Sequence, residues 1–123
     1  MNIKEVYNKL KVLNKFDDSE YLCADEYESK DISFNDTINA ILIIDYPFYE
    51  YDENGKFQST KYKSKIEFSS LHTLFARVRD AISDIFESGM FYYSSHCLEE
   101  LFLEGFSVKR IKNEVYIYPY IGS

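Results

Sequence analysis

The sequence predicts an α+β fold: an N-terminal helix, an antiparallel sheet built from two hairpins, and two further helices packed on one face. Three observations support this prediction. Apolar residues recur at helical spacing in the first segment and again over residues 71–86. A β-branched run over residues 37–46 indicates a buried strand, and Asn54-Gly55 is a strong hairpin signal. With 123 residues, 46% of them hydrophobic, we expect a single domain spanning 1–123.

The first helix is expected from Ile3 to about Asn14, since its apolar residues leave the lysines on the other side. Asn2 can cap this helix, and Glu5 three residues later completes a pattern like a capping box. Residues 20–25 suggest a short strand. The acid-rich stretch that follows is expected to be exposed, and the sequence leaves open whether residues 25–36 are ordered.

The Asn54-Gly55 turn fixes a register if its loop has two residues. That register pairs Glu53 with Lys56, Tyr51 with Gln58, Tyr49 with Thr60, Tyr46 with Lys63 and Asp45 with Ser64. The result would be one long ribbon with acids mostly on the first strand and lysines on the second.

The second half begins with the clearest helix, over residues 71–86, capped by Ser69 or Ser70 and stopped by Gly89. A short strand over residues 90–93 and a further helix over about 95–104 should follow, with Gly105 closing that helix. Residues 106–121 predict a hairpin that turns at 112–114. On its last strand, three tyrosines share one face: Tyr116, Tyr118 and Tyr120.

Charge is unevenly distributed along the chain, whose net charge is −7. Residues 17–53 hold twelve acids against Lys30 alone. Such a field repels nucleic acid and attracts a basic surface, so we expect a basic protein partner and no direct nucleic-acid binding. No apolar run approaches the length of a membrane helix, and the first residues do not resemble a signal peptide. With two distant cysteines, a reducing, cytoplasmic setting is the expectation.

Catalytic and metal sites find little support in the sequence. Cys97 beside His96, or with His72, could form a thiol nucleophile, but Cys97 falls on an apolar stripe and reads better as a core residue. Cys23 could join these three residues in a zinc site, yet the short-spaced ligand pairs of such sites are missing. We therefore expect no enzyme activity, no metal and no cofactor.

Two basic groups could bind anions. Arg77 and Arg79 lie on the exposed side of the main helix and could bind a phosphate or carboxylate, although ion pairs with Asp80 or Asp84 are the better interpretation. The lysines of the 61–65 strand suggest a nucleic-acid-binding strand, but Tyr62 points to the opposite face. Protection of a sheet edge explains those lysines more simply.

The leading functional hypothesis is a small acidic inhibitor that binds and blocks a basic nuclease or nucleic-acid-binding partner. Toxin-immunity proteins and phage anti-defence proteins are of this kind, and the composition suggests a phage or mobile element of an AT-rich host. Aromatic anchors and acids would form the partner-binding site: Asp45, Tyr46, Tyr49, Glu50, Tyr51, Asp52 and Glu53. The alternatives are a small-molecule or nucleotide binder that uses Arg77 and Arg79, and a structural or assembly protein. The oligomeric state is open, and a dimer is possible.

Overall fold

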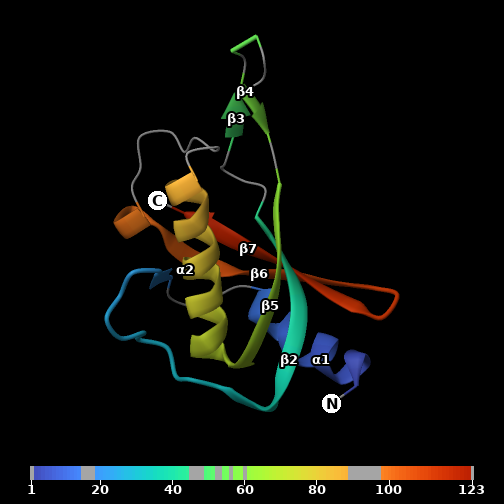
Figure 1. Cartoon of the computed structure of the whole chain (residues 1–123). Helices are drawn as coiled ribbons and strands as arrows, with labels where there is room; N and C mark the ends of the chain where they lie inside the picture. Colours follow the sequence, from blue (N-terminus) through green and yellow to red (C-terminus); the bar gives the residue numbers. More distant parts are fainter. Residues whose placement is uncertain are drawn as a thin grey trace.

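The computed structural model describes residues 2–14, 19–44, 49–51, 54–55, 57–59, 61–88 and 98–122; for residues 14, 49–51, 57–59 and 88 it describes the backbone alone. These residues form a five-stranded sheet in the order β1-β6-β7-β2-β5 and a separate two-stranded sheet, β3-β4 (Figure 1). The strands are β1 Glu20–Tyr21, β2 Ser33–Ile44, β3 Tyr49–Tyr51, β4 Phe57–Ser59, β5 Tyr62–Ser70, β6 Phe102–Ile111 and β7 Glu114–Gly122. The helices are α1 Ile3–Leu10 and α2 Leu71–Ser88, with 3₁₀ turns η1 Lys11–Asn14 and η2 Leu98–Glu100.

The predicted fold class is wrong in two respects. Within the described ranges the chain forms two α-helices instead of three, and the sheet is mixed instead of antiparallel. Strands β2 and β7 run parallel, with Ile41 beside Tyr116 and Leu42 beside Ile117, whereas all the other strand pairs are antiparallel. Each hairpin is antiparallel within itself, but their relative direction depends on the long connection through α2, which no local pattern specifies. In Figure 1 the two hairpins run obliquely to each other, so the sheet is strongly curled.

Both confirmed helices begin with the caps that the sequence indicated. The Oδ1 of Asn2 accepts a hydrogen bond from the backbone N–H of Glu5 at 3.0 Å, and its Nδ2 donates to Glu5 Oε1 at 3.0 Å. At the start of α2, Ser70 Oγ accepts from the backbone N–H of Thr73 at 3.2 Å. These bonds satisfy donors that have no partner within the helix, which fixes where each helix begins.

In the described part of the expected helix over residues 95–104, which begins at residue 98, the chain forms η2 and the first part of β6 instead. Leu98, Leu101 and Phe102 fit helical spacing, but Leu101 and Leu103 also fit the alternation of a strand. Pairing decides between them, because Leu103 lies opposite both Glu20 of β1 and Ile121 of β7. Gly105 therefore ends no helix and instead follows an irregularity in β6, with φ 156. The predicted strand over 90–93 and Gly89 lie outside the described residues.

The register of the first hairpin also differs from the prediction. Tyr51 lies opposite Phe57 and Tyr49 opposite Ser59, so the connection is longer than two residues, although Gly55 has the positive φ of 76 expected of a turn. In the main sheet, Lys63 lies opposite Ile43 and Lys65 opposite Ile41. Lys63 therefore faces Ile43 instead of Tyr46, the partner expected from a two-residue loop.

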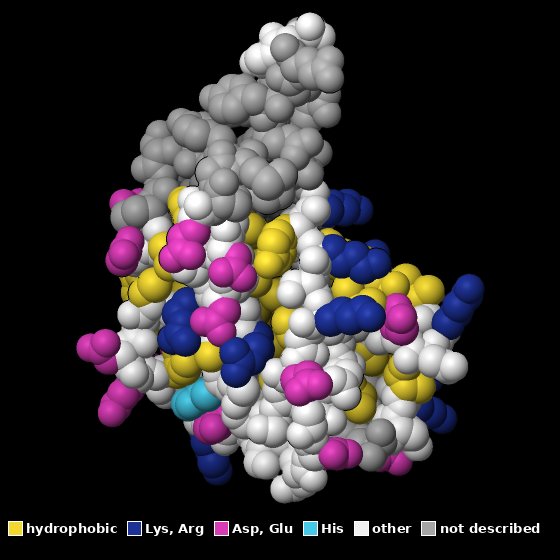
Figure 2. Space-filling view, in the orientation of Figure 1, with side chains coloured by type: hydrophobic (Ala, Val, Ile, Leu, Met, Phe, Trp, Pro, Cys, Tyr) yellow, Lys and Arg dark blue, Asp and Glu magenta, His cyan; other side chains and the backbone are white. Residues whose placement is uncertain are grey.

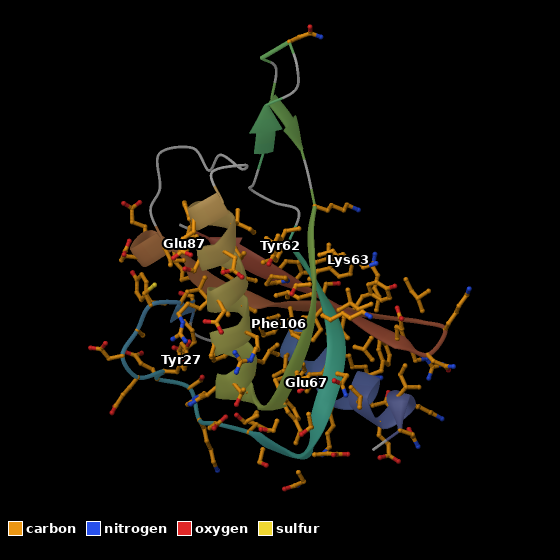
Figure 3. The ribbon with its side chains drawn as sticks, in the orientation of Figure 1. Tyr27, Tyr62, Lys63, Glu67, Glu87 and Phe106 are labelled. Atoms are coloured by element: carbon orange, nitrogen blue, oxygen red, sulfur yellow. The ribbon has the colours of Figure 1, made fainter. Side chains whose placement is uncertain are left out.

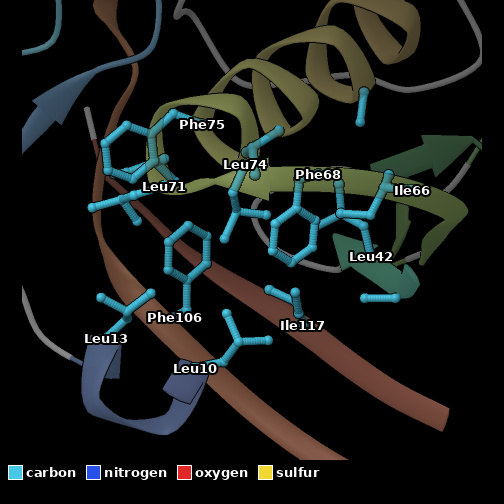
Figure 4. Packing of buried hydrophobic residues seen from close by; sticks show 14 of the residues in the cluster. Leu10, Leu13, Leu42, Ile66, Phe68, Leu71, Leu74, Phe75, Phe106 and Ile117 are labelled. Atoms are coloured by element: carbon cyan, nitrogen blue, oxygen red, sulfur yellow. The ribbon is translucent and has the colours of Figure 1, made fainter. Parts of the chain in front are cut away.

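One hydrophobic cluster joins both helices to one side of the sheet (Figure 4). Phe106 of β6 stacks on Phe75 of α2 with ring centroids 6.3 Å apart, and Leu10 and Leu13 of the N-terminal segment belong to the same cluster. The fully buried core includes Leu42, Phe68, Leu74 and Ile117. Among the described residues, no helix has the length and apolar character needed to cross a membrane.

Candidate functional site

The predicted partner-binding segment is only partly described. Asp45, Tyr46, Asp52 and Glu53 lie outside the described residues. Tyr49, Glu50 and Tyr51 form strand β3, which pairs with β4 beyond the end of the main sheet (Figure 1). The backbone thus places these three residues on a separate ribbon that extends from β2 and β5, and the positions of their side chains are not described.

Arg77 and Arg79 converge on one carboxylate. Arg77 Nη1 lies 2.8 Å from Asp80 Oδ2, and Arg79 Nη2 lies 3.6 Å from Asp80 Oδ1. Arg77 Nε also donates to the backbone carbonyl of Glu67 at 3.3 Å, which ties α2 to the edge strand β5. Arg77 and Tyr62 line an open groove of about 400 Å³, but Asp80 and Asp84 line it too. The ion-pair interpretation is the one that the geometry supports, and the two acids disfavour a phosphate in this groove.

His72 serves to attach the loop of residues 22–32 to the start of α2. Its Nε2 lies 2.7 Å from the backbone carbonyl of Ser29, and its backbone N–H donates to Asp31 Oδ1 at 2.9 Å. The imidazole ring also packs on Tyr27, with centroids 5.2 Å apart, and stacks on Phe75. These contacts account for the ring without any catalytic role. Cys97 and His96, its proposed partners, lie outside the described residues.

Glu20 of β1 holds the same part of this loop. Only 4% of this residue is exposed, and its two carboxylate oxygens accept from the backbone N–H groups of Ser29 at 2.5 Å and Glu28 at 3.2 Å. A carboxylate that bonds two backbone donors is a strong local clamp. Glu20 and His72 together hold residues 28–31 of the acid-rich loop against β1 and the start of α2.

Exposed acids from this loop, from α2 and from η2 lie on the α2 side of the molecule, where Figure 2 shows acidic side chains with a smaller number of basic ones among them. Cys23 of the loop lies close to the other two elements. Burial raises the pKa of its thiol most, the carboxylate of Glu99 in η2 raises it further, and the guanidinium of Arg79 in α2 lowers it. We call this side the acidic surface; it consists of Asp25, Glu26, Glu28, Asp80, Asp84, Glu87, Glu99 and Glu100. The sequence did not predict this surface. Its charge pattern pointed only to residues 17–53, whereas the acids of α2 and η2 lie outside that stretch and join it only in the folded chain.

The opposite side of the sheet is different in character. Figure 3 shows that Lys63 of β5 points away from α2 and that Tyr62 points toward it, and Lys65 shares the face of Lys63 because the two residues alternate along the strand. On the same side, Lys63 Nζ lies 5.8 Å from the ring centroid of Tyr116, and Lys109 Nζ lies 5.0 Å from that of Tyr118. We call this side the open face; it carries Lys61, Lys63, Lys65, Lys109, Tyr116, Tyr118 and Tyr120, together with the exposed acids Glu67, Glu104 and Glu114.

The open face explains why β2 is buried on both sides. Ile41 is 6% exposed and Ile43 is 7% exposed, although both point away from the main cluster. Their cross-strand neighbours are Lys65 and Lys63, and Tyr116 lies beside Ile41 on the parallel strand. The aliphatic stems of the lysines and the tyrosine ring cover the isoleucines and leave the ammonium groups in water.

No grouping of three or more metal-ligating side chains occurs in the part of the chain that the structure describes, where Cys23 is a free, exposed thiol. The chain matches no family model, no curated protein and no solved structure. Functional inference therefore depends on the two surfaces of the molecule.

Proposed function

We propose that this protein is a non-enzymatic, cytoplasmic binding module that blocks a basic protein partner through its acidic surface. The supporting observation is an uneven distribution of charge: the exposed acids of three separate elements share the α2 side of the molecule and outnumber its basic groups, while most lysines of the sheet lie on its other face. A concentrated field of one sign speeds encounter with an oppositely charged surface and orients it.

The aromatic segment predicted from the sequence would supply the anchors of the same interface. Strand β3 leaves the main sheet at the end of β2, and the Figure 1 view shows it beyond the same end of the molecule as the C-terminal end of α2. Tyrosine anchors suit such an interface, since their rings supply contact area and their hydroxyl groups tolerate water. A toxin-immunity or anti-defence role belongs to this class of function.

The test begins with the protein as bait in lysate of its host, eluted with a salt gradient. The retained basic protein is then purified, and its association rate is measured at low and high salt. Asp84→Asn with Glu87→Gln should slow association several-fold at low salt and much less at high salt, because steering is screened. The matched control, Asp36→Asn with Glu114→Gln, changes the net charge equally but lies outside the acidic surface. Equal slowing by both pairs would refute the proposed surface.

A further inference from the structure

The open face joins residues that are far apart in the sequence into one surface rich in lysine and tyrosine, in which four lysines outnumber Glu67, Glu104 and Glu114. Its lysines come from β5, from the residue before it, and from β6, whereas its tyrosines come from β7. These strands become neighbours through the β2–β7 pairing and the β6–β7 hairpin. Both described α-helices contribute to the cluster on the other side of the sheet, so neither covers this surface.

A groove of about 570 Å³ lies within the open face. Lys61 and Lys109 line it together with Tyr118 and Tyr120, and Ser107 and Glu104 supply further polar groups. Its volume falls in the range of small-ligand sites, roughly 300–1,000 Å³. Tyr120 is 44% exposed, so its ring is accessible to a flat partner.

The tyrosines of β7 form one row on the open face, and the lysines at positions 61, 63 and 65 form a second row with the same spacing. Alternate residues of a strand on one face lie about 6.6–6.8 Å apart, which sets the step of the tyrosine row and of the lysine row alike. Successive bases of an extended single strand can therefore meet successive rings, while the lysines follow its phosphates. Stacking on aromatic side chains beside a basic groove is the general physical basis of single-strand binding.

The two lysine–ring contacts show that the cations are already placed over the rings. Exposed contacts of this kind are weak, so a phosphate can take over the ammonium group without a large loss. Glu104 and Ser107 can bond the amino and carbonyl groups of a base edge, which gives the carboxylate a role in an otherwise cationic groove. A duplex lacks free base faces, so it cannot use the tyrosines in this way.

The two sequence arguments against nucleic acid lose their force for this surface. Tyr62 indeed points to the core, but β7 supplies rings to the lysine-bearing side. The acidic surface meets the open face at the edge strand β5, where Asp80 and Asp84 line one groove with Lys65, and the groove that contains Lys61 and Lys109 has Glu104 as its acidic lining residue. Exposed charges separated by more than about 8 Å are largely screened at physiological salt.

We propose that the open face binds a segment of single-stranded nucleic acid, with bases stacked on Tyr118 and Tyr120 and phosphates paired with Lys61 and Lys109. This activity is independent of the acidic surface and goes beyond the blocking role. An acidic peptide could pair with the lysines, but it would leave the rings without a partner. The row of rings therefore favours the nucleic acid.

The test is fluorescence anisotropy with labelled single-stranded oligonucleotides of about 12 nucleotides, both DNA and RNA, a length within the usual site sizes. We expect binding that weakens steeply as salt rises. Lys61→Gln with Lys109→Gln should reduce the slope of log K against log salt by about 1.4, the value for two lost contacts to a single strand. Tyr118→Leu should weaken binding about tenfold, the loss expected for one stacked base, while its leucine still covers the sheet.

Matched controls come from α1, where Lys11 Nζ lies 5.8 Å from the ring centroid of Tyr7. Tyr7→Leu and Lys11→Gln make the same chemical changes outside the open face, so each should leave affinity within about twofold. Amide shifts of the unmodified protein during titration with the oligonucleotide provide a readout that needs no variant. They should concentrate on β5, β6 and β7 and spare α2.

Several results would overturn the proposal. These are absence of binding at low salt, equal losses in the α1 controls, or amide shifts on α2 instead of the sheet. If a duplex bound with the same affinity as the single strand, and Tyr118→Leu changed neither affinity, the binding would be due to charge attraction alone. A poly-glutamate peptide that binds as well as the oligonucleotide, with the same loss on Tyr118→Leu, would show that the face receives an acidic peptide.

Discussion

Replacing Glu20 by glutamine tests whether a single buried carboxylate holds the acid-rich loop in place. Its two oxygens accept from the backbone N–H groups of Ser29 and Glu28 in a site that is almost closed to water. Glutamine keeps the shape and one oxygen, but its amide N–H₂ must face the second backbone donor. One charge-assisted bond is lost and one buried donor is left without an acceptor.

The expected cost is about 1–3 kcal/mol of unfolding free energy, the range for a hydrogen bond to a charged group or for an unsatisfied buried donor. For 123 residues, an unfolding entropy of about 2.1 cal/mol/K per residue converts this loss to a Tm lower by about 4–12 °C. Urea unfolding gives the free energy, and hydrogen exchange gives the protection of the Ser29 amide, which should fall even if the loop opens locally.

Glu26→Gln is the matched control, since it makes the same chemical change at an exposed position of the same loop. It should alter stability by no more than about 0.5 kcal/mol, as surface substitutions usually do. A Glu20→Gln protein with an equally small loss and an unchanged exchange rate at Ser29 would refute the clamp that we assign to Glu20.

Three further predictions follow from other parts of the molecule. Phe106→Ala should lower the unfolding free energy by about 3–5 kcal/mol in urea titrations, because it opens a cavity beside Phe75 in the fully buried core; a loss below about 1 kcal/mol would contradict that packing. Lys112 has φ 55 at the turn between β6 and β7, so Lys112→Gly should raise stability by about 0.4–1 kcal/mol, and a destabilised variant would count against that backbone conformation. Glu99→Gln should lower the pKa of Cys23, since it removes the carboxylate that adds to the effect of burial. The alkylation rate of the Cys23 peptide, followed by mass spectrometry across pH, should then reach its midpoint at lower pH. An unchanged midpoint would show that Glu99 does not lie close enough to Cys23 to affect its thiol.

Local signals predicted the local parts of this fold. Asn2 with Glu5, and Ser70 before α2, act within one helical turn, so their meaning does not depend on the rest of the chain. The secondary structure around Leu101 and Leu103 was harder to predict, because their spacing suits a helix as well as a strand. Pairing of β6 with β1 and β7 decides in favour of the strand. The parallel pairing of β2 with β7 depends on a connection of many residues, and no short stretch of sequence encodes its direction.

The same distinction applies to the candidate surfaces. The sequence drew attention to residues 45–53, where rings and acids are adjacent in the chain. It placed Tyr116, Tyr118 and Tyr120 together on one strand face, which the register confirms. Their association with Lys63 and Lys109 appears only when β7 is placed between β6 and β2. Strand order, which the sequence does not reveal, is what turns two separate rows into one surface.

The interior position of β7 also matters while the protein is being made. On the ribosome, β2 and β5 can pair as soon as they emerge, but the other edge of β2 has no partner until residues 114–122 follow. During that interval a strand rich in isoleucine presents an open edge, the kind of template that recruits other chains. Until that hairpin docks, the core lacks Val115 and Ile117 and the open face lacks its tyrosines, so one late strand completes both sides of the sheet.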